Sequence, residues 1–544
     1  MNSFTVRLRA KDGEHTFRLT KNARCRYFEA KVINSSGRIS LEIIPKQKLR
    51  LLCVSYTMHY PFESSDRIFL NGYQSWTYSP EKTIHEADTS LKYFPDMLTR
   101  KYGLDRYGDG FFYKGKVTRS VHHGYSYAYI RQGSLYTLFG SLCEDSGFTV
   151  IEFNTSADTV TFRKDCTGRL VTAPYKALDM MLASGSEGDV FDRFFELMEI
   201  PKPSVGCKLG YTSWYDHYQE IDELKLITDL AGLDEMPAKP DIFQIDDGFE
   251  TFVGDWFDID PDKFPDGLHS VVKNISRSDM TAGIWLAPFV CEKESKLYRE
   301  HGDWLLRDRH GRPVYAGCNW SGAYALDFYN GQVREYIRRV LAHYKELGFR
   351  LFKLDFLYAA CMIPRRDKTR GEIMSEAMQF LRKELDGCMI LGCGVPLASA
   401  FGRVDFCRIG CDMTLDFDDK PHMRLAHAER PSTKNTMTDT VFRRQLSGRA
   451  FLNDPDVFLL RDTNTKLTDA EKRDLAFVNS MCGGLLFTSD NCSQYSEHAK
   501  QVFTKALELR NATVTDACMC KGKVIVTYEL DGKQAVLELA GSAG

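Results

Sequence analysis

Two charged side chains stand close together inside the apolar run RLFKLDFLYAA at residues 350–360. In a β-strand successive side chains point to opposite faces, so Lys353 and Asp355 share one face, and Phe352, Leu354 and Phe356 take the other. A buried charge is stable only when it is paired or hydrogen-bonded, so this face must look into a polar environment. A structural ion pair at a sheet margin and a chemical site both fit this pattern, and the rest of the chain must decide between them.

Short apolar strands alternate with longer helical patterns between Cys207 and Asp490. The helical periodicity is plainest in DKFPDGLHSVVKNISRS and GQVREYIRRVLAHYKELGF. The strands are CKLGYTSW, DIFQIDD, AGIWLAPF, RLFKLDF, CMILGCG, DFCRIGCD, RAFLND and GLLFTSD. Eight β-units joined mostly by helices, with no hairpin signal, predict a (β/α)8 barrel.

The carboxyl ends of the barrel strands are where the active site of such a fold lies. In this chain they carry acids, aromatic rings and two cations: Trp214, Tyr215, Asp216, Asp246, Asp247, Trp285, Lys353, Asp355, Cys393, Gly394, Arg408, Asp412, Asn453 and Asp454. Carboxylates bind hydroxyl groups, and flat rings cover the apolar C–H face of a sugar. One such acid could simply cap the helix that follows its strand. Five at the strand ends, without counting Asp216 just after strand one, indicate a carbohydrate site that could use two carboxylates for glycoside cleavage.

The regions on either side of the barrel differ from it in pattern. Residues 1–200 form short alternating runs broken by turn residues and end in the helical segment GDVFDRFFELM, which predicts a large antiparallel β-sandwich. The tail alternates again around a DG turn in KVIVTYELDGKQAVLELAG. We therefore expect three domains, 1–200, 201–490 and 491–544, the last being a small β-domain.

The composition limits the classes of function. A chain of 544 residues exceeds one core, and a net charge of −3 gives no reason to expect nucleic acid or a membrane surface as a partner. The first residues show no secretory signal, and the 16 cysteines are scattered, many within apolar strands. We expect a cytoplasmic protein with reduced thiols, without a cofactor and without a metal site.

Several blocks of the barrel region resemble a known family. FKLDFLY, LGCGVPL, VDFCRIGCD, FQIDDGFE and FLNDPD are similar, in order, to the signature blocks of glycoside hydrolase family 36, and most of all to its compact bacterial α-galactosidases. NGYQSW resembles the tryptophan loop that the N-terminal domain of that family lends to the active site. The resemblance implies an N-terminal β-supersandwich, a central (β/α)8 barrel and a small C-terminal β-sandwich, in agreement with the three zones.

The resemblance also implies roles for individual residues. Asp355 matches the nucleophile and Asp412 the general acid/base of a retaining mechanism through a covalent galactosyl-enzyme. Lys353 is expected to favour the charged form of Asp355. Asp246 and Asp247 match the pair that holds the 4- and 6-hydroxyls of galactose. The substrate-binding positions implied are Trp76, Trp214, Asp246, Asp247, Trp285, Lys353, Cys393, Gly394 and Arg408.

Two positions depart from the family pattern, and several functions remain open. Tyr211 stands where the family often has tryptophan, and Cys411 stands where close relatives have proline; Asp216 and Asp255 are expected to be positioning residues only. The leading hypothesis is a retaining α-galactosidase on melibiose- or raffinose-like oligosaccharides. The alternatives are an α-N-acetylgalactosaminidase, distinguished by room near Cys393, Gly394 and Arg408, an α-galactosyl transglycosidase, and a non-catalytic sugar-binding module. The expected partner is a small carbohydrate, and the protein is expected to be a monomer or small homo-oligomer.

Overall fold

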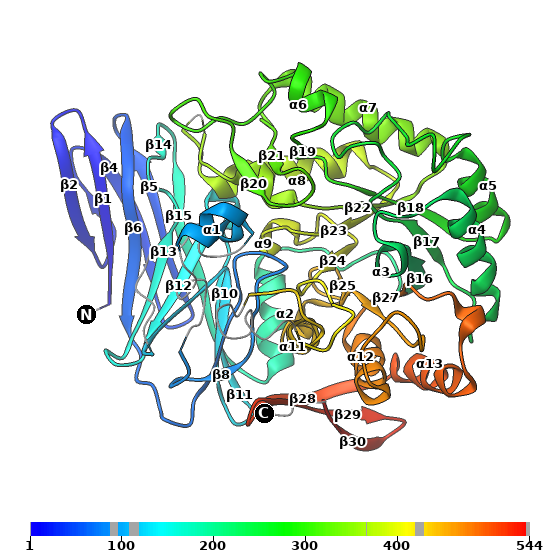
Figure 1. The fold of residues 1–544 in the computed structure, drawn as a ribbon. Helices are drawn as coiled ribbons and strands as arrows, with labels where there is room; N and C mark the ends of the chain where they lie inside the picture. The colour runs from blue at the N-terminus through cyan, green and yellow to red at the C-terminus, as the bar shows by residue number, and fades with distance from the viewer. Residues whose placement is uncertain (1, 88–95, 108–118, 366, 419–428, 540–544) are drawn as a thin grey trace.

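The computed structural model describes residues 2–87, 96–107, 119–365, 367–418 and 429–539. Antiparallel sheets of the N-terminal part stand beside a central barrel with helices around it, and a small C-terminal sheet lies below both (Figure 1). This arrangement confirms the predicted fold class of a central barrel between β-domains.

The N-terminal part is built from two antiparallel sheets that share a core. The first is ordered β2-β1-β6-β13-β12-β9, with β14 also on β6. Its strands are β1 (Ser3–Ala10), β2 (Gly13–Leu19), β6 (Leu49–His59), β9 (Val121–Tyr125), β12 (Thr149–Asn154), β13 (Thr159–Lys164) and β14 (Leu170–Val171). The second is ordered β3-β4-β5-β15-β11-β10-β7-β8. It contains β3 (Ala23–Arg24), β4 (Phe28–Asn34), β5 (Arg38–Pro45), β7 (Arg67–Leu70), β8 (Lys82–Thr83), β10 (Tyr127–Gln132), β11 (Leu135–Ser141) and β15 (Tyr175–Gly185).

Alternation explains why these segments form a sandwich. In β1 the side chains of Phe4, Val6 and Leu8 are fully buried, while those between them are not. The sandwich is closed by α2 (Glu187–Leu197), the helix predicted for this segment, which packs on β11 and β15. Gly140 in β11 makes room for it, because a Cβ there would meet the Phe194 ring at 2.5 Å.

The predicted strands of the barrel are all present and parallel. Around the barrel the order is β25-β24-β23-β22-β18-β17-β16-β27-β26. The strands are β16 (Lys208–Thr212), β17 (Ile242–Ile245), β18 (Thr281–Leu286), β22 (Leu351–Leu354), β23 (Met389–Gly392), β24 (Phe406–Arg408), β25 (Leu452–Asp454), β26 (Val457–Phe458) and β27 (Leu485–Thr488). Strand seven is split: β25 pairs with β24 and β26 pairs with β27. The break falls at Pro455, which has no N–H to donate, and Asp456, whose φ is 74°.

Helices alternate with these strands, and the longer ones cover the outside of the barrel (Figure 1). They are α3 (Trp214–His217), α4 (Glu223–Gly232), α5 (His269–Arg277), α7 (Gly331–Leu347), α8 (Arg370–Glu384), α9 (Leu397–Ala400), α11 (Thr433–Phe442), α12 (Asp469–Cys482) and α13 (Glu497–Leu509). Thr369 and Thr468 begin α8 and α12 with capping boxes. Within the described ranges no helix is long and apolar enough to cross a membrane.

One part of the barrel differs from the prediction of helical connections without hairpins. Between β18 and α7 the chain forms a three-stranded antiparallel sheet of β19 (Val290–Glu292), β20 (Tyr315–Gly317) and β21 (Ala323–Ala325), together with α6 (Lys296–Glu300). These strands have only three residues each, too few for the alternation on which strand prediction depends. This insertion carries residues of the site described below.

The C-terminal part forms one small sheet among the described residues. β28 (Thr513–Cys520), β29 (Lys523–Leu530) and β30 (Lys533–Glu538) make one antiparallel layer, with the DG turn at Asp531 and Gly532, both at positive φ. The sheet contacts the N-terminal sandwich, where Arg67 of β7 donates a hydrogen bond to the Met519 carbonyl at 2.7 Å. Because α13 packs on α12, we propose that the barrel domain extends past residue 490 to the end of α13.

Candidate active site

A cavity of about 460 Å³ opens at the carboxyl ends of the barrel strands. Most of the predicted site residues line it: Trp76, Trp214, Asp246, Asp247, Trp285, Lys353, Asp355 and Asp412. The remaining three, Cys393, Gly394 and Arg408, are buried directly behind the wall and contact residues that line it. The structure therefore brings together, around one cavity, side chains from the barrel strands and from the N-terminal domain.

Asp355 lies just past β22, and both of its oxygens are held. Trp285 Nε1 donates to Oδ2 at 3.1 Å, and the backbone N–H of Phe356 donates to Oδ1 at 2.8 Å. Phe356 has φ of 52°, a conformation that bulky residues rarely adopt, so the chain turns sharply behind the carboxylate. Burial raises the pKa of Asp355; Lys353 offsets part of this effect, and Asp412 adds to it.

Lys353 makes its ion pair with Asp246, not with its neighbour on the same strand. Its Nζ donates to Asp246 Oδ2 at 2.7 Å, and Gln244 Nε2 donates to the same oxygen at 2.7 Å. The geometry follows from the barrel, in which inward side chains of alternate strands, here the second and the fourth, meet in one layer. Burial opposes the charge of Lys353, but Asp246 raises its pKa above the usual range. Lys353 therefore acts on Asp355 only through its electric field.

Asp247 is less completely hydrogen-bonded than Asp246. Its Oδ2 accepts from Trp320 Nε1 at 2.8 Å and from Gln219 Nε2 at 3.1 Å. Its Oδ1 is buried and meets no donor among the described residues. Burial raises the pKa of Asp247, and the adjacent charge of Asp246 adds to this.

Asp412 occupies the rim of the cavity, where its side chain is 49% exposed. Arg408 Nη1 donates to Asp412 Oδ1 at 2.8 Å. The buried Arg408 guanidinium also contacts Asp454 Oδ2 at 3.2 Å and Asp456 Oδ1 at 2.8 Å. Burial raises the pKa of Asp456 to about 6. A carboxyl group at the rim can exchange protons with solvent, whereas Asp355 at the base of the cavity is shielded.

Trp76 is the contribution of the N-terminal domain to the cavity. Its loop is joined to the barrel by the Ser75 N–H, which donates to the Val395 carbonyl at 2.9 Å. The indole Nε1 of Trp76 donates to Cys393 Sγ at 3.2 Å. Gly394 has φ of 58°, and a Cβ on it would lie 3.0 Å from the indole, so only glycine fits there.

Phe356 lines the cavity, so its predicted place on the other strand face is wrong, because β22 ends at Leu354 and the chain turns there. Two further aromatic residues that line the cavity were not predicted, Tyr107 and Trp320. The Gln74 side chain donates to the Tyr107 carbonyl, and the Tyr107 hydroxyl donates to Asn319 Oδ1 at 2.6 Å. Trp320 lies in the connection between β20 and β21, with its ring 5.0 Å from that of Phe356. Neither residue ends a barrel strand, so the pattern that located the other residues gave no signal for them.

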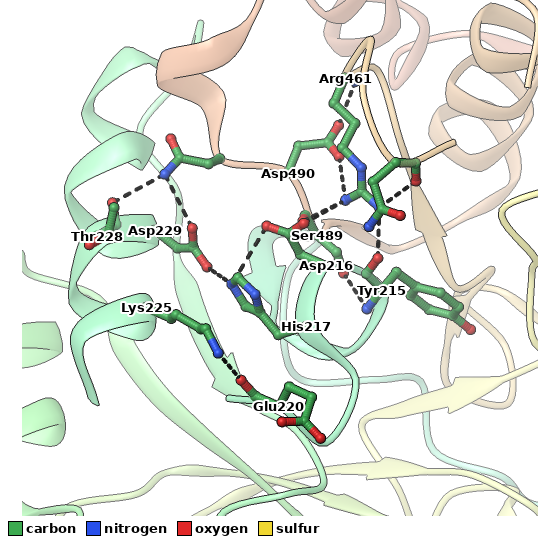
Figure 2. A network of polar contacts seen from close by, with 12 residues as sticks. Tyr215, Asp216, His217, Glu220, Lys225, Thr228, Asp229, Arg461, Ser489 and Asp490 are labelled. Atoms are coloured by element: carbon green, nitrogen blue, oxygen red, sulfur yellow. Dashed lines mark hydrogen bonds and ion pairs between the residues drawn. The ribbon is translucent and has the colours of Figure 1, made fainter. Parts of the chain in front are cut away.

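A polar network lies behind α3 (Figure 2). His217 Nε2 is 2.6 Å from Asp229 Oδ2 and 3.5 Å from Asp216 Oδ2. Arg461 pairs with Asp216 Oδ1 at 3.3 Å and donates to the Tyr215 carbonyl at 2.7 Å. Burial opposes the charge of His217, but its two acidic neighbours raise its pKa overall. The network fixes the short helix that carries Trp214 and Tyr215 into the cavity.

This network also accounts for Tyr211 and Asp216. The buried Tyr211 hydroxyl donates to Asp229 Oδ2 at 2.5 Å, so this position supports α3 from behind the cavity wall. Ligand atoms of Asp216, His217 and Asp229 lie within 4.8 Å of one another, but each already has a protein partner, so they form an ion network. Asp255 accepts from the first N–H groups of α6 and caps that helix.

Comparison with known proteins finds sequence similarity in the barrel region. The melibiase family profile matches residues 214–364, from α3 past Asp355. The chain is 31% identical over 160 residues to an A-type blood α-D-galactosamine galactosaminidase from Flavonifractor plautii and 31% identical over 102 residues to an α-galactosidase from Escherichia coli. These stretches cover 27% and 18% of this chain, but only 15% and 14% of those proteins.

Solved structures match over almost the whole chain. An α-galactosidase from Thermus thermophilus, in complex with stachyose, is 26% identical with a TM-score of 0.71, over 90% of this chain and 99% of that one. The family 36 α-galactosidase AgaA from Geobacillus stearothermophilus shares the fold at 12% identity, with a TM-score of 0.60 over 96% of this chain and 80% of that one. The melibiase profile thus matches the first half of the barrel, and the solved α-galactosidase structures share the fold of almost the whole chain.

Proposed function

We propose that this protein is a retaining α-galactosidase that releases terminal α-linked galactose from small oligosaccharides such as melibiose and raffinose. The observation that carries the proposal is the pairing of a shielded carboxylate, Asp355, with a rim carboxyl group, Asp412, in one cavity. The Thermus relative, which has been solved with p-nitrophenyl α-D-galactopyranoside and with stachyose, supports the choice of sugar.

The reaction would proceed by two displacements. Asp355, held by Trp285 and the Phe356 N–H, attacks the anomeric carbon while Asp412 gives its proton to the departing glycosidic oxygen. The C–O bond to the leaving sugar breaks as the bond to Asp355 forms, which yields a covalent galactosyl-enzyme. Asp412, now ionised, takes a proton from water, whose oxygen attacks the anomeric carbon and frees Asp355. Two inversions retain the α configuration.

Binding would depend on the acids of the second strand and on the indole rings. Asp246 is paired with Lys353, and Asp247 is oriented by Trp320 and Gln219. A carboxylate placed for the axial 4-hydroxyl of galactose is left without a partner when glucose binds, which disfavours glucose. Trp76 and Trp214 would cover the apolar face of the ring.

The galactosaminidase among the relatives keeps an α-N-acetylgalactosaminidase as the second candidate. That activity needs space for an acetamido group beside Cys393 and Gly394. In this chain the Trp76 indole closes over Gly394, and Cys393 is only 1% exposed. The crowding favours galactose.

A panel of p-nitrophenyl α-glycosides distinguishes these functions. We expect turnover of the α-galactoside, with at most trace turnover of the α-glucoside and the α-N-acetylgalactosaminide, and release of α-galactose as the first product by proton NMR. Preferred cleavage of the acetamido sugar would establish the second candidate, and β-galactose as first product would refute retention. Dominant oligosaccharide synthesis at low acceptor concentration would indicate a transglycosidase.

Two further proposals concern the state of the protein. All 16 cysteines have free thiols, which supports a cytoplasmic location. A monomer or small homo-oligomer remains our proposal for assembly. Light scattering on the purified protein tests the assembly, and cell fractionation tests the location.

A further inference from the structure

A second acid lies against Asp247, and the proposed reaction does not use it. Glu250 follows β17 in the chain and is 6% exposed. It is held in a narrow ladder, in which it bridges Ile259 and the Thr251 N–H donates to the Asp258 carbonyl at 2.9 Å. This ladder fixes the backbone at Glu250, whose carboxyl group interacts with that of Asp247.

The backbone between Asp247 and Glu250 is constrained at Gly248. Gly248 has φ of 115°, and a Cβ there would come within 2.7 Å of the backbone of Gln219. Gln219 in turn donates its side-chain amide to Asp247 Oδ2. Asp247, Gly248 and Gln219 are therefore packed together, and with Gln219 on Oδ2 the opposite oxygen of Asp247, Oδ1, is left without a partner among the described residues.

Acceptors outnumber donors at this contact. Asp247 Oδ1 and both carboxyl oxygens of Glu250 are buried, and no donor among the described residues reaches them with hydrogen-bond geometry. Two ionised carboxylates in contact would repel each other and leave buried oxygens unsatisfied. One proton on Glu250 removes the repulsion and supplies the missing donor.

Among the residues that the structure describes, the nearby lysines are engaged elsewhere and do not replace that proton. Lys353 is already paired with Asp246. Lys263 donates to the carbonyls of Gln219 and Gly248, at 2.8 and 3.0 Å. Burial and the charge of Asp247 together raise the pKa of Glu250 well above its usual range.

We propose that Glu250 is a neutral carboxylic acid whose O–H donates to Asp247 Oδ1, and that this hydrogen bond keeps Asp247 ionised and positioned toward the sugar hydroxyls. The proton stays on Glu250 throughout the reaction, so no atom is transferred. Glu250 is thus a positioning residue, and the second half of the inference rests on the proposed α-galactosidase function.

Infrared difference spectroscopy tests the proton directly, whether or not the protein turns over a galactoside. Wild type minus Glu250→Gln at neutral pH should show the carbonyl stretch of a protonated carboxylic acid, shifted in D2O. The matched control is Glu81→Gln, which changes a buried glutamate of the N-terminal domain that is paired with Arg131 at 2.6 Å. The control should not remove that band. A wild-type spectrum without this band would refute the neutral acid.

Kinetics with p-nitrophenyl α-galactoside test the positioning role. Glu250→Gln keeps a donor for Asp247 and should retain kcat/KM within about threefold, while Glu250→Leu removes the donor and should lower kcat/KM about 10- to 100-fold. Equal losses in both variants, or no loss in a folded Glu250→Leu, would refute the positioning role. If the wild type lacks α-galactosidase activity but shows the band, the proposed function fails and the neutral acid stands.

Discussion

Replacing Trp76 with alanine should show how much the N-terminal domain contributes to the sugar site without changing the two catalytic carboxyl groups. The loop around Trp76 should stay in place, because its attachment does not depend on the indole. The buried Arg443 side chain donates to the carbonyls of Ser75 and Gln74 and to Ser79 Oγ. The substitution therefore removes the ring that faces the cavity and leaves Asp355 and Asp412 where they are.

The expected loss in kcat/KM follows from the area of the Trp76 indole that is not already packed against protein and can contact the sugar. A buried tryptophan covers about 150–250 Å². In Trp76 part of this surface already packs edge-on against Phe356 and Tyr358, with ring centroids 5.2 and 5.9 Å away. If about 60–100 Å² remains for the sugar, the loss is ~1.5–2.5 kcal/mol at ~25 cal/mol per Å². That corresponds to a decrease of about 10- to 70-fold in kcat/KM.

The assay is steady-state kinetics on p-nitrophenyl α-galactoside and on melibiose, with thermal unfolding as a check on the fold. Trp76→Phe keeps a ring but loses the hydrogen bond to Cys393, so it should lie between wild type and alanine. Trp304→Ala is the matched control, because Trp304 is a half-buried indole, bonded to Gln332, that does not line the cavity. Wild-type kcat/KM for Trp76→Ala on both substrates would show that the loop only packs, and would refute the reasoning.

Two further predictions concern acids of the barrel. Asp355→Ala and Asp412→Ala should each lower turnover of an α-galactoside by orders of magnitude with unchanged unfolding temperature, and azide should partly rescue the first; near-normal activity in either would end its assignment. Asp439, whose Oδ2 is buried and has no partner among the described residues, has a pKa raised to about 7 by burial. The pKa of Asp439 in the folded protein lies above that in the unfolded chain, so the stabilising protonated form of Asp439 is lost as pH rises through 7. Asp439→Asn should therefore gain stability relative to wild type between pH 5 and 9, by on the order of 1–3 kcal/mol. Paired melting curves measure this, and a growing wild-type advantage at high pH would contradict it.

Strand periodicity could predict the barrel and most of the cavity residues, because both depend on where each strand begins and ends in the sequence. In a parallel barrel the carboxyl ends of the strands meet on one face, so Asp246 and Asp355 could be placed together from the positions where their strands end. The partner of Lys353 could not be predicted in this way, since it depends on which strands contribute to one inward layer. Trp320 depends on the small sheet inserted after β18, whose strands of three residues carry no period.

The carboxylates at the base of the cavity share one feature, a hydrogen-bond donor from another element of the fold. Each acid that the proposed chemistry needs ionised is held by donors from another element: Asp246 by Lys353 of β22, and Asp355 by Trp285 of β18. Asp247 follows the same rule on Oδ2, where Trp320 donates from the inserted sheet. Its Oδ1, in contrast, meets no donor among the described residues, and the adjacent Glu250 is an acid that can donate only by keeping its proton. A neutral Glu250 therefore gives Asp247 the donor that Asp246 and Asp355 already have. It does so without adding a fourth negative charge at the base of the cavity.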